Sequence, residues 1–173
     1  MTKKVVHLFR HTANEGDTLT ADGVVAAVAI GARLTSDYSI AVSSGAQRAT
    51  QTIACILGRL GSTASEGVVV VEALRSTRED QWREAYRKAG AGDLESLRAA
   101  DPDLVAIDSP ALAEGLRAAF ALLAEGGRAL AVGHGPTNEA AVYGLTGVVI
   151  DPLGKGDGIE ITLTDGEFTL RPT

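Results

Sequence analysis

Basic side chains recur in this sequence at the points where predicted strands end. They are Arg10 and His11 after residues 3–9, Arg48 after residues 38–45, and His134 after residues 128–133. In a parallel sheet the carboxyl ends of neighbouring strands meet at one edge, and ligands bind there. We therefore expect these four side chains to converge on one pocket.

Such a pocket suits a phosphate group. Arginine offers a planar fork of donors for phosphoryl oxygens, and Arg48, predicted in the first turn of a helix, would add the positive end of that helix. A neutral histidine can attack phosphorus through a ring nitrogen and form a phosphoenzyme. A second, protonated histidine would stabilise the charge on the transferring group. The residue types alone leave open whether His11 or His134 attacks.

Composition narrows the class of protein. The chain has 173 residues, 45% hydrophobic and 22% charged, which predicts one globular domain over residues 1–173. The formal net charge is -6 and there is no lysine or arginine block, so we expect neither a nucleic-acid nor a membrane partner. One cysteine and three histidines offer no disulfide and no metal-ligand cluster, so no cofactor is predicted. The N-terminal apolar run is too short for a signal sequence, and a cytoplasmic location is expected.

Strand and helix patterns alternate along the chain. After the first strand, helices are predicted at 19–34 with Thr20 as N-cap, at 46–60, at 78–90 and 93–104 with a break at Pro102, at 109–127 with Ser109 as N-cap and Pro110 at the first position, and at 137–147. Further strands are predicted at 68–74 and in a hairpin at 159–171 that turns at Asp165-Gly166. This order predicts an α/β fold, a three-layer α/β/α sandwich with a mostly parallel central sheet and an antiparallel C-terminal edge hairpin.

Four segments in this order resemble the motifs of the histidine phosphatases, the phosphoglycerate mutase-like superfamily. They are Arg10-His11-Thr12, LTADG at 19–23, SSGAQRATQT at 43–52 and VGHGP at 132–136. The resemblance implies that His11 is the nucleophile, that Arg10 and Arg48 bind phosphoryl oxygens, and that His134 is the second, electrostatic histidine. It also implies a polar phosphate contact in the loop after His11, for which Asn14 is the candidate. The short chain and VGHGP are most similar to the small bacterial phosphohistidine phosphatases.

The sequence departs from the family pattern at three positions. Ser76, in ALRST, stands where larger members carry a glutamate that protonates the leaving group. Glu72 is our candidate for that acid, with Glu79 as an alternative, and a phosphohistidine substrate could instead leave as neutral imidazole without one. Thr12 replaces a glycine, so its Cβ could crowd the phosphate or its hydroxyl could add a donor. Gly45 replaces a proline, which is expected to loosen a turn.

We therefore expect a metal-independent phosphatase that forms a phosphohistidine on His11 and acts on protein phosphohistidine or a small phosphomonoester. The alternative is a catalytically silent relative that binds phosphate or a phosphoprotein. A nucleotide-binding reading of AVGHGPTNE is disfavoured, because the G-x-G-x-x-G and P-loop patterns are missing. The loops at 75–108 are expected to set specificity. The oligomeric state does not follow from the sequence.

Overall fold

The chain folds around one mixed β-sheet, described by a computed structural model of residues 2–173. The strands are β1 (Lys3–Arg10), β4 (Ile40–Ser43), β5 (Val68–Val70), β6 (Arg128–Gly133), β7 (Gly158–Thr164) and β8 (Glu167–Pro172). Their order across the sheet is β5-β4-β6-β1-β7-β8. β5, β4, β6 and β1 are parallel, while β7 and β8 are antiparallel to their neighbours. The predicted parallel sheet with an antiparallel edge hairpin is confirmed.

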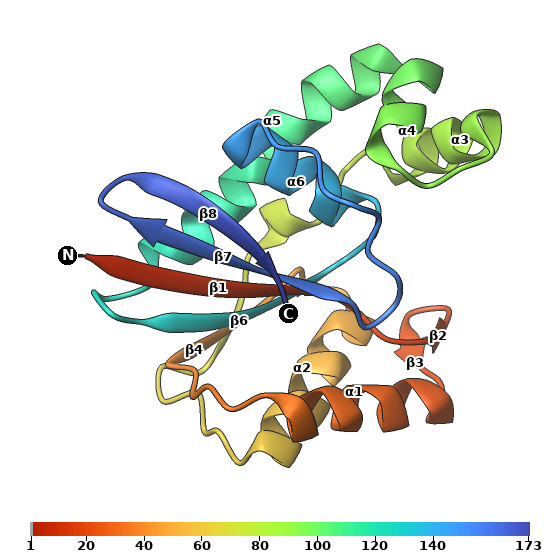
Figure 1. Cartoon of the computed structure of the whole chain (residues 1–173). Helices are drawn as coiled ribbons and strands as arrows, with labels where there is room; N and C mark the ends of the chain where they lie inside the picture. The colour runs from red at the N-terminus through yellow and green to blue at the C-terminus, as the bar shows by residue number, and fades with distance from the viewer. Residues whose placement is uncertain (1) are drawn as a thin grey trace.

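Helices cover both faces of this sheet (Figure 1). On one face lie α1 (Ala21–Arg33) and α2 (Gln47–Leu60), and on the other lie α5 (Pro102–Ala121) and α6 (Thr137–Thr146). Alternation along β1 explains the two cores: Val6 and Leu8 pack with α5 and α6, whereas Phe9 packs with α1 and α2. The predicted three-layer sandwich is thereby confirmed. None of the helices in residues 2–173 has the length and apolarity to cross a membrane.

Two short helices, α3 (Glu79–Ala89) and α4 (Leu94–Ala100), follow the 3-10 turn η1 (Glu72–Leu74) and project beyond the edge of the sheet (Figure 1). Their charged residues face solvent, but Trp82, Ala85, Leu94 and Leu97 are buried in the α5 side of the core. The predicted helical segments between residues 78 and 100 are confirmed, and they stand next to the strand ends.

Local turn and cap signals act as the sequence predicted. The Thr20 side chain accepts a hydrogen bond from the backbone N–H of Gly23 and begins α1. Asp165 and Gly166 have φ values of 50° and 87°, the two positive angles that a tight hairpin turn between β7 and β8 requires. The loop predicted after His11 contains an additional two-residue hairpin, β2 (Asn14–Glu15) with β3 (Thr18–Leu19).

The predicted start of the long helix at Ser109 and Pro110 is wrong. α5 begins at Pro102, and the Asp101 side chain accepts the N–H of Leu104 as its cap. Pro110 therefore lies inside the helix, where it removes one backbone donor. Leu104, Val105 and Leu112 are buried on both sides of it, so tertiary packing holds the helix together across this position.

The third predicted strand is shorter than expected. β5 ends at Val70, and Glu72 to Leu74 form η1, so the expectation of a strand through residue 74 is wrong. β5 is an edge strand paired only through three residues with β4, and Val68 and Val70 are half-exposed. Because β5 has a neighbouring strand on one side only, its ladder of hydrogen bonds is short. The chain leaves the sheet after Val70, and the following turn buries Leu74 in the core.

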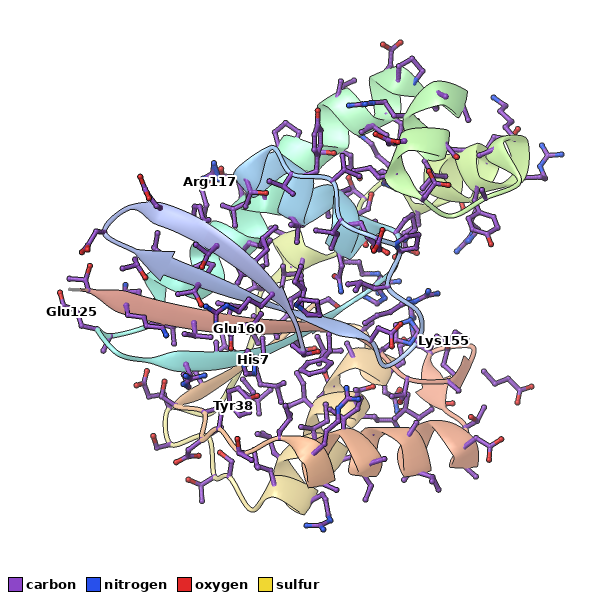
Figure 2. The ribbon with its side chains drawn as sticks, in the orientation of Figure 1. His7, Tyr38, Arg117, Glu125, Lys155 and Glu160 are labelled. Atoms are coloured by element: carbon purple, nitrogen blue, oxygen red, sulfur yellow. The ribbon has the colours of Figure 1, made fainter. Side chains whose placement is uncertain are left out.

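His7, to which the sequence assigns no function, takes part in a buried network between sheet and loop. Its Nδ1 lies 2.5 Å from the Tyr38 hydroxyl and its Nε2 lies 2.9 Å from Oε2 of Glu160 on β7. Figure 2 shows the three side chains together near the middle of β1, away from the strand ends. Both ring nitrogens are satisfied, and His7 has a structural role.

Candidate active site

The strand register places the Arg10-His11 motif beside the Gly133-His134 motif. Arg10 is paired with Gly133 at the ends of β1 and β6, so His11 and His134 are the residues that directly follow these two adjacent strands. Their imidazole rings lie 5.3 Å apart between centroids. Ser43 is paired with Val132 across β4 and β6, which brings Ser44 to the same edge. The carboxyl ends of β1, β6 and β4 therefore meet at one edge of the sheet, as predicted.

Arg48 connects both histidines. Its Nε donates to Nε2 of His11 at 3.3 Å, and its Nη2 lies 3.2 Å from Nδ1 of His134. A guanidinium has no acceptor, so each of these histidine nitrogens carries a lone pair directed at Arg48. An anion that binds Arg48 therefore meets both imidazoles.

These contacts fix the proton positions of both rings. His11 donates from Nδ1 to the Thr12 carbonyl at 2.8 Å, which leaves a lone pair on Nε2, the atom that accepts from Arg48. His134 accepts at Nδ1, so its proton is on Nε2, which donates to the Ser44 hydroxyl at 2.7 Å. His11 is thus held in the tautomer that an attack on phosphorus through Nε2 requires.

Both imidazoles are neutral at neutral pH. Burial lowers the pKa of His11 to about 4, against the hydrogen bond to Thr12 and together with the positive charges of Arg48, Arg10 and Lys155. Burial also lowers the pKa of His134 to about 3, with a further lowering by Arg48. A phosphate dianion bound between these groups would raise the pKa of His134, because a nearby negative charge favours the protonated imidazole.

Asp17, at the tip of the β2–β3 hairpin, holds Arg48 from the opposite side. Its Oδ1 accepts from Nη1 of Arg48 at 2.7 Å, and its Oδ2 accepts from the backbone N–H of Gln47 at 3.1 Å. This carboxylate caps α2, whose own N-cap residue Ala46 makes no side-chain bond. We expected the end of α2 to face the phosphate, but its first N–H group donates to Asp17.

Arg10 reaches the site from the end of β1. Its Nη1 donates to the Leu153 carbonyl at 2.9 Å, and the Leu153 N–H donates to Oε1 of Glu139 at 2.7 Å. Within residues 2–173, Arg10 Nε and Glu139 Oε2 are buried without a hydrogen-bond partner. Burial raises the pKa of Glu139. The loop at 151–157 thus locks Arg10 in place.

A cavity of about 800 Å³ opens at this edge of the sheet. Its lining includes Arg10, Arg48 and His134 from the strand ends, and Ser76, Glu79 and Trp82 from the segment that follows β5. His11 is not among the lining residues, but its Nε2 is bonded to Arg48, which is. The segment at 75–108, predicted to border the pocket, also contributes Arg83, Tyr86 and Gly92 to the lining.

The predicted acid and the predicted loop contact lie elsewhere. Glu72 is exposed at the start of η1 and does not line the cavity. Glu79 does line it, but a hydrogen bond from Arg75 lowers the pKa of its carboxyl. Asn14 donates to the Gly16 carbonyl and accepts from Lys155 at 2.9 Å, which joins the β2–β3 hairpin to the loop at 151–157. Lys155 is labelled beside that hairpin in Figure 2.

Two of the departures from the motif have structural explanations. The Thr12 hydroxyl donates to the Gly23 carbonyl at 2.7 Å, and the residue is fully buried, so it stabilises α1 and adds no donor to the pocket. Gly45 has a φ of 92°, an angle that proline cannot adopt. The turn before α2 therefore has its own conformation, and the expectation of a merely looser turn is corrected.

Sequence reasoning missed three residues that hold His134 and Arg48. Ser44 bonds His134, Asp17 bonds Arg48, and Asn138 accepts the backbone N–H of His134 at 3.1 Å. Ser44 follows β4 directly, so the strand-end argument that identified His11 applies to it. Asn138 is four residues from His134, within the same turn, whereas Asp17 is 31 residues from Arg48, so no local pattern connects that pair.

No group of three or more His, Cys, Asp or Glu side chains in residues 2–173 is arranged to hold a metal ion.

Neither a protein-family model nor a curated protein matches this sequence. Solved structures do match. A phosphoglycerate mutase from Bacillus anthracis str. Sterne superposes with a TM-score of 0.72 at 19% identity, over 99% of this chain and 93% of that one. The phosphoserine phosphatase of Entamoeba histolytica, in complex with 3-phosphoglyceric acid, gives 0.71 at 19% identity over 96% and 94%. The protein histidine phosphatase SixA complexed with tungstate gives 0.59 at 17% identity over 96% and 94%.

This chain therefore has the same fold as these phosphoglycerate mutase and phosphatase structures. In each comparison the superposition covers nearly the full length of this chain and of the solved structure. The lower TM-score with SixA means that overall shape does not single out the small phosphohistidine phosphatases within this fold.

Proposed function

We propose that this protein is a metal-independent phosphatase that transfers a phosphoryl group to Nε2 of His11 and then to water. The observation that carries the proposal is the Arg48 guanidinium, bonded at once to Nε2 of His11 and to His134. In that position an incoming phosphoryl group can take the arginine donors while the freed Nε2 lone pair faces phosphorus.

The chemistry follows from the proton positions. Nε2 of His11 forms a bond to phosphorus as the bond to the leaving group breaks, and the proton on Nδ1 stays on the imidazole, hydrogen-bonded to the Thr12 carbonyl. Water then attacks phosphorus, and the imidazole leaves as a neutral group. His134, protonated by the approach of the dianion, and Arg10 stabilise the charge on the phosphoryl oxygens in both steps.

The proposed substrates are a phosphorylated small molecule or a phosphoprotein, including protein phosphohistidine. The structural neighbours act on or were solved with phosphorylated or oxyanionic ligands, among them 3-phosphoglyceric acid and tungstate. Tungstate and phosphate are both tetrahedral oxyanions, which fits a pocket with Arg10 and Arg48 in its wall.

Rapid-quench trapping of the phosphoenzyme tests the proposal. Wild type is mixed with an activated aryl phosphate and, separately, with a phosphohistidine protein, and phosphate release is measured in parallel. We expect an acid-labile, base-stable label on wild type and none on His11→Ala. Absence of both label and turnover, with retained vanadate binding, would instead identify a silent phosphate-binding relative.

Metal removal provides a second test. We expect full activity in excess EDTA, because Arg10, Arg48 and His134 supply the positive charge that phosphoryl transfer needs. The measurement is the rate of aryl phosphate hydrolysis before and after dialysis against EDTA. Complete loss that added divalent metal restores would show that these side chains are not the whole catalytic apparatus.

A further inference from the structure

The cavity at the strand ends is larger than a phosphate group requires. Its volume of about 800 Å³ lies within the range of pockets that enclose small-molecule ligands, roughly 300–1,000 Å³. Arg10, Arg48 and His134, which the proposed function assigns to the phosphoryl group, make up one part of its lining. The remaining lining is available to the organic part of a substrate, and its chemistry indicates what that part is.

Some of this remaining lining is apolar and adjoins the phosphate-binding side chains. Pro136 is the second residue after His134 in the chain, and it lines the cavity. Leu153 lines the cavity as well, and its carbonyl accepts from Nη1 of Arg10 at 2.9 Å. Pro152 precedes it and is also part of the lining. The group attached to the phosphoryl oxygen therefore meets apolar surface, which favours an apolar group over a charged one.

One face of helix α3 extends the lining further. The α3 residues that contribute to it are Glu79, Trp82, Arg83 and Tyr86. Their spacing of three and four residues places them on the same side of the helix. At 3.6 residues and a rise of 1.5 Å per residue, Tyr86 lies about two turns, or roughly 10 Å, along the helix from Glu79. The cavity is thus long enough for a substrate that extends well beyond its phosphate.

The Tyr86 ring is held in place but is left open. Tyr86 is 54% exposed and is the one aromatic residue among the exposed large hydrophobic side chains of residues 2–173. Trp82, one turn earlier, is 3% exposed, and its indole N–H donates to Oδ2 of Asp108 at 2.6 Å. Tyr86 rests on the loop after α3, because a Cβ at Gly92 would lie 3.0 Å from its ring atom Cε2. An anchored helix and a close backbone therefore present an uncovered aromatic ring at the cavity.

We propose that Tyr86 is a specificity-determining residue that stacks on an aromatic ring of the substrate, and that the substrate is a small phosphomonoester with such a ring. This inference rests on the proposed phosphatase activity. Arg10 and Arg48 bind the phosphoryl group, the chain between phosphate and ring lies along Pro136 and Leu153, and the ring reaches Tyr86. Stacked rings gain free energy beyond the burial of their area. In protein phosphohistidine the ring is bonded directly to phosphorus, and the experiment distinguishes that class.

Direct binding of phosphonates tests the ring subsite, because they are not hydrolysed and leaving-group reactivity does not affect the result. Isothermal titration calorimetry compares methylphosphonate with phosphonates that carry a phenyl ring on one to four methylene groups. Each phenyl ligand has a cyclohexyl partner of the same length, which is apolar but not aromatic. We expect the best phenyl ligand to bind wild type about tenfold more tightly than methylphosphonate and about three- to tenfold more tightly than its cyclohexyl partner.

Three variants assign the effect to the ring. Tyr86→Ala should lose about three- to tenfold in affinity for the best phenyl ligand and stay within about twofold of wild type for methylphosphonate. Tyr86→Phe keeps the ring and should bind every ligand as wild type does. Ile107→Ala is the matched control, because Ile107 on α5 is 55% exposed, like Tyr86, but does not line the cavity.

Equal affinity for phenyl and cyclohexyl ligands in wild type, or a phenyl preference that survives in Tyr86→Ala, would overturn the ring subsite. Faster dephosphorylation of a phosphohistidine protein than of phenylalkyl phosphates, equal in wild type and Tyr86→Ala, would overturn the substrate class. Failure of the proposed function looks different, because wild type would then show the phenyl preference in calorimetry but form no His11-dependent phosphoenzyme.

Discussion

Arg48 is the residue on which the site depends most. Its guanidinium donates to Asp17 and to His11 and lies within hydrogen-bond distance of His134. Each of its three nitrogen atoms therefore has a partner. The planar fork holds these directions at once, whereas an ammonium group is a compact charge on a flexible stem. Arg48 therefore combines anion binding with alignment of the two rings.

Replacing Arg48 with lysine tests this arrangement. We expect Arg48→Lys to lower kcat/KM for an aryl phosphate by about 100-fold or more, because the lysine keeps the charge but loses the fork. Steady-state kinetics give the measurement, with circular dichroism to verify folding. Arg59→Lys, in the last turn of the same helix, is the control and should match wild type. Wild-type kinetics in Arg48→Lys would remove Arg48 from the site.

At the scale of elements, α5 and α6 pack without a gap. A Cβ at Gly144 on α6 would lie 2.1 Å from the Ser109 carbonyl oxygen on α5, a backbone atom that cannot rotate away. α6 carries Asn138 and Glu139, which fix the backbone of His134 and the loop at Leu153. The close contact between these helices thus supports the site as well as the core.

Gly144→Ala should force these helices apart. We expect a loss of about 2–3 kcal/mol in the free energy of unfolding, the usual cost of overpacking against a fixed neighbour. Urea denaturation measures it. Gly58→Ala on α2 is the matched control, because a Cβ there meets nothing within 4 Å, and it should stabilise by about 0.5–1 kcal/mol. Equal stability of the two variants would contradict the packing described.

At the scale of the whole molecule, burial of all three histidines couples folding to pH. Burial is the first cause that lowers the pKa of His7, His11 and His134, to about 4 for His11 and about 3 for His134. Between about pH 4 and 6.5 the unfolded chain therefore binds protons that the folded chain does not. Stability must fall as the pH is lowered through this range, since the unfolded state then gains protons.

The midpoint of thermal unfolding should consequently drop between pH 7 and pH 5. We expect a smaller drop in the double variant His11→Asn/His134→Asn, which lacks two of the three groups. Calorimetry across this range is informative because the carboxyl groups with lowered pKa values, such as Glu79 and Glu160, lose their stabilising effect only at lower pH. The same pH dependence in both proteins would show that His11 and His134 are not the source.

The sequence by itself determined the α/β class, the alternation of strands and helices along the chain, and the choice of the four central side chains. Apolar runs that end in a polar residue, such as residues 3–10 and 128–134, are local signals, and parallel strands bring their ends together whatever lies between them. The convergence of Arg10, His11, Arg48 and His134 at one edge of the sheet follows from this rule.

Only the tertiary structure decided what surrounds those side chains. Asp101-Pro102 and Ser109-Pro110 are both an N-cap residue followed by proline, the local signal for the start of a helix. α5 begins at the first of them, because the extra turns bury Leu104 and Val105. Asp17 lies 31 residues from Arg48 and Asp108 lies 32 residues from Ser76, so no pattern along the chain joins them. These contacts form only when the helices and strands pack together, because packing is what brings Asp17 to Arg48 and Asp108 to Ser76.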